Sequence, residues 1–203
     1  MTPLLEQLRD ETRALHEQTE QRLYSDALRA GTLSVDQYGH LLLIHAAFHA
    51  ALEQAIDRHA AFFTDYEPEI RRKTPWLLAD LTPLHQDVPA RPELFASWSP
   101  AELTGAAYVG EGSMLGGKTV WHYLQQSPAL RPALDQARFY RGYGAETGAR
   151  WRSFGAFVNQ QTDHVAVLDG ARRAFLLYND LFERTQSASL SLPPDTQAEK
   201  RGK

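Results

Sequence analysis

Cysteine is absent from the 203 residues of this sequence. Its absence excludes disulfide bonds, thiolate metal ligands and cysteine nucleophiles, and it is typical of a cytoplasmic protein. No stretch approaches the roughly 18 apolar residues that a membrane helix needs, and the first residues lack the basic and apolar regions of a signal peptide. The net charge is −4, whereas nucleic-acid binding requires clustered positive charge. We therefore expect a cytoplasmic protein with no membrane or nucleic-acid partner.

Alternating strand patterns are also lacking, and helical signals predominate. Ser34 followed by Gln37 predicts a capping box, and Ser99 to Glu102 combines a cap, Pro at the first helical position and an acid in the first turn. A turn or loop is expected over residues 139–148, which hold three glycines. Helices are expected from Pro3, over residues 35–59 and 76–84, from Pro100 to about residue 126, and over residues 150–161 and 165–184.

The chain is expected to form one domain followed by a tail. Residues 1–185 are long enough to bury a hydrophobic core with room for a ligand pocket. Residues 186–203 are rich in Ser and Pro and end in charged residues, which predicts a disordered tail. The predicted fold is a single-domain, all-α helical bundle.

Glycine is concentrated in one unusual place, the segment GAAYVGEGSMLGG at residues 105–117. Five of the 13 glycines lie here although the flanking sequence is helical, and each Gly inside a helix costs about 1 kcal/mol relative to Ala. Gly112 and Gly116 are four residues apart and share a helical face, on which a flat ligand can approach the backbone. Close packing between helices, or a break in the helix, explains the cluster equally well. The spacing matches neither of the common phosphate-binding loops.

A polar stripe runs along the first predicted helix. Arg9, Arg13, His16 and Glu20 recur at helical spacing beside a face of leucines. A neutral imidazole at this place is a suitable iron ligand, and the two arginines could meet an acidic group of a ligand lying over the helix. From spacing alone, a solvated stripe is the favoured interpretation.

A second pattern, formed by His45, His49 and Glu53, places three potential metal ligands on one helical face. Such a set could bind zinc or non-heme iron. The sequence contains no Glu-x-x-His, so the pattern of ferritin-like di-iron proteins is absent. We expect a polar stripe on a mostly buried helix rather than a metal site.

Four segments resemble the heme oxygenase family, and in particular its bacterial members. LRDETRALHEQTE at residues 8–20 resembles the first helix, in which a histidine ligates heme iron. YVGEGSMLGG at 108–117 resembles the kinked, glycine-rich distal helix, and AFLLYNDLFE at 174–183 resembles the last core helix. Residues 139–157 are similar to the same region of members that serve bacteriophytochromes. The segments occur in the family's order, which favours the ligand interpretation of both His16 and the glycines.

The resemblance implies specific roles for residues of this chain. Heme would lie between the first helix and the distal helix, with His16 as the axial iron ligand and Gly112 and Gly116 beside the bound oxygen. Ser113 would help to position oxygen and water, although many members have an aspartate there and serine carries no charge. Two basic residues would pair with the heme propionates, namely Arg9 and Arg152. The full set implied in substrate binding is Arg9, Arg13, Glu20, Tyr108, Gly117, Arg152 and Phe175.

The activity implied by the resemblance is oxidative cleavage of heme to biliverdin, ferrous iron and carbon monoxide. Heme b would be both substrate and cofactor, and O2 the oxidant. Electrons would come from an external donor of the ferredoxin or flavin reductase type, because the chain has no thiol, cluster motif or flavin fingerprint. A bacteriophytochrome is a candidate acceptor of the biliverdin.

Three alternatives follow from other classes of function. Ser113 leaves open a heme carrier or sensor with the same fold and no catalysis. A thiaminase-like hydrolase would need a cysteine nucleophile, which the sequence lacks. A helical interaction module with no small ligand leaves the clustered glycines unexplained.

Overall fold

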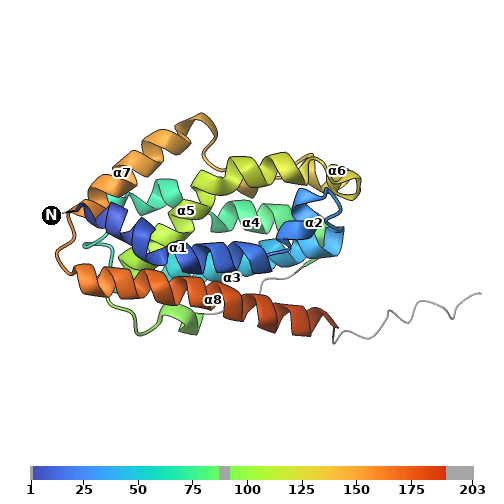
Figure 1. Cartoon of the computed structure of the whole chain (residues 1–203). Coiled ribbons are helices and arrows are strands. Elements are labelled where there is room, and N and C mark those ends of the chain that lie inside the picture. Colours follow the sequence, from blue (N-terminus) through green and yellow to red (C-terminus); the bar gives the residue numbers. More distant parts are fainter. Residues whose placement is uncertain (1, 87–91, 191–203) are drawn as a thin grey trace, which may run out of the picture.

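Helices are the only regular secondary structure in residues 2–86 and 92–190, the ranges that this computed structural model describes (Figure 1). They are α1 (Leu4–Arg22), α2 (Ser25–Arg29), α3 (Val35–Asp57), α4 (Thr74–Leu81), α5 (Pro100–Leu124), α6 (Arg131–Leu134), α7 (Thr147–Asn159) and α8 (His164–Leu190). Short 3-10 turns occur at η1 (Thr64–Tyr66), η2 (Pro68–Arg71), η3 (Thr82–Leu84), η4 (Pro92–Phe95), η5 (Pro128–Leu130), η6 (Phe139–Arg141) and η7 (Gly144–Glu146). The predicted all-α class is confirmed. No helix in the described ranges is long and apolar enough to cross a membrane.

Local sequence signals determine where α3 and α5 begin. The Ser34 hydroxyl accepts a hydrogen bond from the Gln37 backbone N–H at 3.1 Å, and the Gln37 side chain accepts one from the Ser34 N–H at 3.0 Å. Ser99 and Glu102 form the same reciprocal pair ahead of α5, with Pro100 at the first helical position. The predicted capping box at Ser34 and the predicted helix start at Ser99 are both confirmed, and such a cap stabilises a helix by about 1 kcal/mol.

Several helix ends differ from the prediction. α8 continues past residue 185 to Leu190, because residues 186–190 contain neither Pro nor Gly. The rest of the predicted tail, residues 191–203, lies outside the described residues. α4 stops at Leu81 and is followed by a 3-10 turn, because Pro83 has no N–H with which to continue the helix. The short helices α2 and α6 were not predicted, since so few residues show no periodic pattern.

α8 is the helix against which α1, α3 and α5 all pack. α1 and α8 lie side by side in Figure 1 and run in the same direction, with an ion pair of 2.7 Å between Arg22, the last residue of α1, and Glu183 of α8. The backbones of α5 and α8 are in direct contact at Gly105, since a Cβ on this residue would overlap the carbonyl oxygen of Val167. α7 lies against both α1 and α5. α8 therefore fixes the relative positions of α1 and α5.

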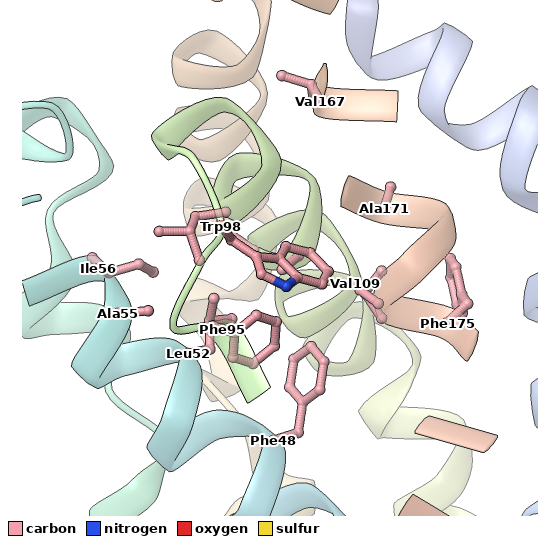
Figure 2. Close-up of a cluster of buried hydrophobic side chains, with 14 of the residues drawn as sticks. Phe48, Leu52, Ala55, Ile56, Phe95, Trp98, Val109, Val167, Ala171 and Phe175 are labelled. Atoms are coloured by element: carbon pink, nitrogen blue, oxygen red, sulfur yellow. The ribbon is translucent and has the colours of Figure 1, made fainter. Parts of the chain in front are cut away.

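Aromatic side chains join α3 and α8 in the core (Figure 2). Phe48 of α3 stacks on Tyr178 of α8 with ring centroids 4.3 Å apart, and it meets the edge of Phe95 at 5.3 Å. Trp98 covers Phe95 at 4.9 Å. Burial of each phenylalanine stabilises the fold by about 1.5–3 kcal/mol. Phe175 belongs to the same cluster, so the core holds the part of α8 that faces α1.

Candidate functional site

His16 lies on the exposed side of α1 but rests against the core. Its side chain is 54% exposed, and Nε2 lies 3.5 Å from the Glu20 carboxylate one turn later. Its ring meets the buried ring of Phe175 edge-on, with centroids 5.8 Å apart. The imidazole is thus supported on one side and accessible on the other, which suits a ligand for a bound group.

Tyr108 brings α5 into contact with α1. Burial raises the pKa of the Tyr108 hydroxyl, and a hydrogen bond with the Thr12 side chain acts in the opposite direction. Gly112 and Gly116 follow Tyr108 by one and two helical turns, so they continue the face of α5 that contacts α1. A Cβ built on either glycine would meet no atom within 4 Å. We call these two residues the glycine face.

The glycine face and His16 lie on the same side of the Tyr108–Thr12 contact. His16 is one turn beyond Thr12 on α1, and the two helices run in the same general direction (Figure 1). An accessible imidazole on α1 and a surface without side chains on α5 thus both lie beyond the Tyr108–Thr12 contact, each by one to two helical turns.

The other three glycines of the segment allow close packing against neighbouring elements. Gly105 allows the backbone contact with α8, and a Cβ on Gly110 would lie 3.1 Å from the His49 ring. A Cβ on Gly117 would lie 3.2 Å from the Tyr140 carbonyl oxygen, so this residue packs on η6 and not beside the glycine face. Close packing and an open surface, the two explanations that the sequence left open, thus apply to different glycines of one helix.

Ser113 uses its hydroxyl within α5. The Oγ donates a hydrogen bond of 2.7 Å to the Gly110 carbonyl oxygen, three residues earlier. Such bonds back to the preceding turn bend helices, and α5 changes direction along its length (Figure 1). The lone pairs of the Ser113 oxygen remain available to accept a hydrogen bond from water.

Basic residues border the Tyr108 end of this region. Arg9 and Arg13 are both about two-thirds exposed and pair with Asp10 at 3.2 and 3.0 Å. Arg152 is exposed on α7, and its neighbour Trp151 packs on Tyr108 with ring centroids 6.1 Å apart. Positive side chains are thus carried by α1 and α7, the two helices that contact Tyr108 through Thr12 and Trp151.

The three potential metal ligands of α3 do not come together in the structure. His45 bonds through Nδ1 to the Tyr178 hydroxyl at 3.2 Å, and burial lowers its pKa to about 3. The Glu53 carboxylate instead accepts from the backbone N–H groups of Lys73 and Thr74. In the described part of the chain, no three His, Asp or Glu side chains come together as metal ligands.

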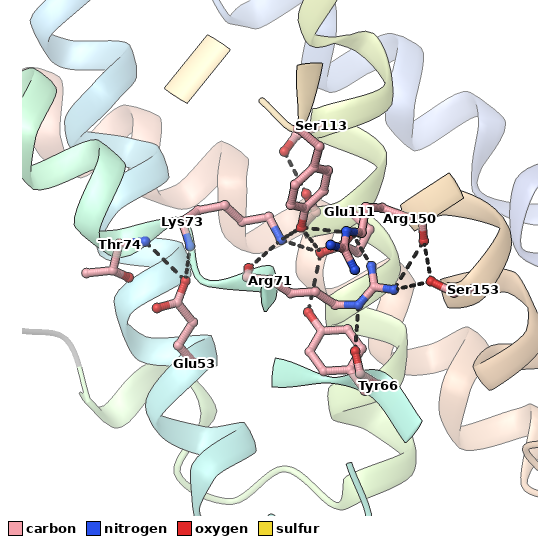
Figure 3. Close-up of polar contacts among 11 residues, drawn as sticks. Glu53, Tyr66, Arg71, Lys73, Thr74, Glu111, Ser113, Arg150 and Ser153 are labelled. Atoms are coloured by element: carbon pink, nitrogen blue, oxygen red, sulfur yellow. Dashed lines mark hydrogen bonds and ion pairs between the residues drawn. The ribbon is translucent and has the colours of Figure 1, made fainter. Parts of the chain in front are cut away.

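One buried charged residue of functional interest was not identified from the sequence. Glu111, between two glycines of α5, is buried and binds Arg71, Lys73 and Tyr143 (Figure 3). The only local signal was a single acidic residue in an otherwise apolar stretch of helix. Its partners are about 30 to 40 positions away in the sequence, which no spacing rule would reveal.

Known proteins share this combination of sequence and fold. The family model described as heme oxygenase matches residues 2–184. The chain belongs to the heme oxygenase family. A curated heme oxygenase from Xanthomonas campestris pv. campestris (strain 8004) is 32% identical over 140 residues, which cover 69% of this chain and 82% of that protein.

Solved heme oxygenases have the same helical fold. The NO- and CO-bound structures of the Neisseria meningitidis enzyme align with a TM-score of 0.72 and 22% identity, covering 92% of this chain and 94% of that one. Heme oxygenase-1 from Synechocystis sp. PCC6803, solved in complex with heme, aligns with a TM-score of 0.76 and 18% identity over 93% and 95% of the two chains. The predicted heme oxygenase-type bundle is confirmed.

Proposed function

We propose that this heme oxygenase holds heme b between α1 and the glycine face of α5 and cleaves it with O2 to biliverdin, ferrous iron and carbon monoxide. The observation that carries the proposal is the pairing of an accessible histidine, His16, with a neighbouring helix wall that has no side chains at Gly112 and Gly116. Family membership supports heme degradation as the reaction.

The chemistry of the residues fits heme. A neutral imidazole binds iron well, and open space beside two glycines allows a flat macrocycle to approach the helix backbone. Phe175 offers an apolar ring next to His16. The basic side chains at the Tyr108 end suit two propionates, which are carried by one edge of heme. The residues that we assign to these basic contacts are Arg9, Arg13 and Arg152.

Each residue has a distinct task in this proposal. Bound heme supplies the iron at which oxygen is activated, and its own ring is the substrate. The imidazole of His16 would hold the iron, and the Glu20 carboxylate, 3.5 Å from Nε2, can orient the ring as a hydrogen-bond acceptor. The glycine face would limit the space on the side of the heme away from His16, and the Ser113 oxygen could hold a water molecule there.

Electrons must come from outside the chain. The sequence has no cysteine that could hold an iron–sulfur cluster, so we propose an external donor of the ferredoxin or flavin reductase type. We place the reaction in the cytoplasm, because such donors occur there and proteins of this compartment rarely carry disulfides. The likeness of residues 139–157 to members that serve bacteriophytochromes makes such a photoreceptor the proposed acceptor of biliverdin.

Reduction of the heme complex in air tests the proposed reaction. Purified protein is titrated with hemin, and ascorbate is then added together with catalase, which removes free peroxide. We expect the Soret band to saturate at one heme per chain and then to give way to the spectrum of biliverdin. A Soret band that survives reduction would favour the second candidate, a heme carrier or sensor, which the uncharged Ser113 keeps in consideration.

A further inference from the structure

A buried group of charged and hydroxyl side chains behind the glycine face has no task in the proposed reaction. We call it the Glu111 cluster; it consists of Tyr66, Arg71, Lys73, Glu111 and Tyr143 (Figure 3). The side chains of Arg71, Lys73 and Glu111 are 0%, 2% and 1% exposed. Buried ion pairs add little net stability, because the cost of removing the charges from water offsets their attraction. The cluster therefore needs an explanation other than stability.

Four donors converge on the Glu111 carboxylate, three from residues 66–73 and one from Tyr143. Arg71 donates to Oε2 at 2.8 Å, and the Lys73 ammonium donates to Oε1. The Tyr143 hydroxyl lies 3.0 and 3.2 Å from the two oxygens, and that of Tyr66 lies 3.5 Å from Oε1. Burial, followed by the charge of Glu111, raises the pKa of both tyrosines, so both hydroxyls keep their protons and can donate. A single turn of α5 is thus bound to η1, η2 and the residues before η7.

Arg71 extends this connection to α7. One terminal nitrogen of Arg71 donates to the Arg150 carbonyl oxygen at 3.1 Å and to the Ser153 hydroxyl at 2.7 Å, while Nε donates to the Tyr66 carbonyl oxygen. Lys73 also donates to the Arg71 carbonyl oxygen at 2.8 Å and to the Tyr143 hydroxyl at 2.9 Å. Both cations therefore have several hydrogen-bond acceptors, and a buried network of hydrogen bonds joins α5 to α7.

The glycine face has no comparable support of its own. Gly112 and Gly116 carry no side chain, and the space next to them is open to at least 4 Å. A helix rich in glycine bends easily. Glu111 directly precedes Gly112, and its side chain leaves the helix about 100° around the axis from the bare surface. Its contacts are placed to resist movement of this turn.

We propose that Glu111 is a positioning residue that fixes the backbone of the glycine face and thereby determines which edge of the heme ring is opened. The inference rests on the proposed function. Because backbone, and no side chain, bounds the space for oxygen at Gly112 and Gly116, the position of that backbone decides which ring carbon the oxygen can reach. Glu111 acts on the reaction only through this wall.

Glu111→Gln tests the inference, because it keeps the shape of the side chain and removes its charge. In the heme-free protein, we expect backbone amides of residues 110–116 to exchange with deuterium about tenfold faster than in wild type. In the heme-loaded protein reduced with ascorbate, we expect biliverdin isomers in a broader distribution than wild type gives. Tyr143→Phe removes one donor and should produce the same changes to a smaller extent, and it serves if Glu111→Gln does not fold.

Glu102→Gln is the matched control. It removes a carboxylate from the same helix, where it binds Arg173, but it lies more than two turns before Gly112. This variant should leave both the exchange of residues 110–116 and the isomer distribution as in wild type. If Glu111→Gln lowers the melting temperature but changes neither readout, the cluster only stabilises the fold and the inference is overturned. Absence of biliverdin from wild type would instead contradict the proposed function, and the exchange experiment would still judge whether Glu111 holds this turn.

Discussion

The glycines of α5 differ in their surroundings: some allow close packing of the helix, and others leave its surface bare. At Gly105 a Cβ would overlap another backbone, and at Gly117 it would press on one. At Gly112 and Gly116 it would meet nothing. The first pair lets the helix pack, and the second pair leaves its surface bare. Stability and ligand binding should therefore respond oppositely to substitution at the two kinds of position.

Gly116→Leu should separate these effects. The new side chain enters open space, so the free energy of unfolding should stay the same or rise by up to about 1 kcal/mol from the better helix former. Hemin affinity should fall at least tenfold, which corresponds to about 1.4 kcal/mol. Thermal unfolding and hemin titration measure the two quantities. Unchanged hemin affinity would show that this face does not border the ligand.

His16→Ala should remove the iron ligand without harming the fold. The side chain is 54% exposed and contributes one ring contact with Phe175 and one exposed pair with Glu20, so stability should change by less than about 1 kcal/mol. The ferric heme spectrum should change and biliverdin formation should be lost, with partial recovery when imidazole is added. Wild-type turnover by the variant without imidazole would refute the assignment of His16.

Among the elements, α5 connects the site to the core. Its N-terminal half packs on α8 at Gly105, its middle carries both the glycine face and Glu111, and its later part packs on η6 at Gly117. The same helix is therefore fixed at both ends and on one side while one surface remains bare. Its position should depend most strongly on the α5–α8 contact.

Gly105→Ala tests the importance of that contact. The added methyl group would overlap the backbone of α8 at Val167 and Ala171, so the helices must separate. Such overpacking costs about 1–3 kcal/mol or more, and each kcal/mol lowers the melting temperature of a chain of this size by about 2–4 °C. Gly148→Ala in α7 is the control, because its methyl group meets only the flexible end of Arg152 and should not destabilise. Equal melting temperatures for the two variants would contradict the packing role of Gly105.

Features that depend on residues close together in the sequence could be predicted from it. The caps at Ser34 and Ser99 and the extents of α3 and α5 follow from local hydrogen bonds and from the absence of Pro. Which glycine packs and which stays open depends on the helix opposite, and spacing alone does not contain that information. The partners of Glu111 come from η1, η2 and the residues before η7, so that cluster required the folded chain.

For the whole molecule, buried histidines make stability depend on pH. Burial lowers the pKa of His45 to about 3 and holds that of His49 well below its ordinary value of 6.5. Both are therefore neutral in the folded protein at pH values where the unfolded chain protonates them. Between about pH 6.5 and pH 3 the unfolded state binds more protons, so acid favours unfolding.

The free energy of unfolding should accordingly decrease as the pH falls below about 6.5, with a slope approaching 1.4 kcal/mol per pH unit for each of the two histidines. Urea unfolding at a series of pH values measures this slope. His45→Gln keeps a polar side chain near Tyr178 but cannot titrate, so its slope should be shallower. A wild-type stability that does not change between about pH 7 and pH 5 would contradict the neutral burial of these residues.

The release of carbon monoxide tests the central claim most directly, because this gas comes from the carbon that is removed when the heme ring opens. Protein loaded with one heme per chain is reduced in air with catalase present, and carbon monoxide and biliverdin are both quantified. The account predicts equal amounts of the two products, each matching the heme consumed. Loss of the Soret band without carbon monoxide would mean that heme is bleached and not opened by this protein, and would contradict the account.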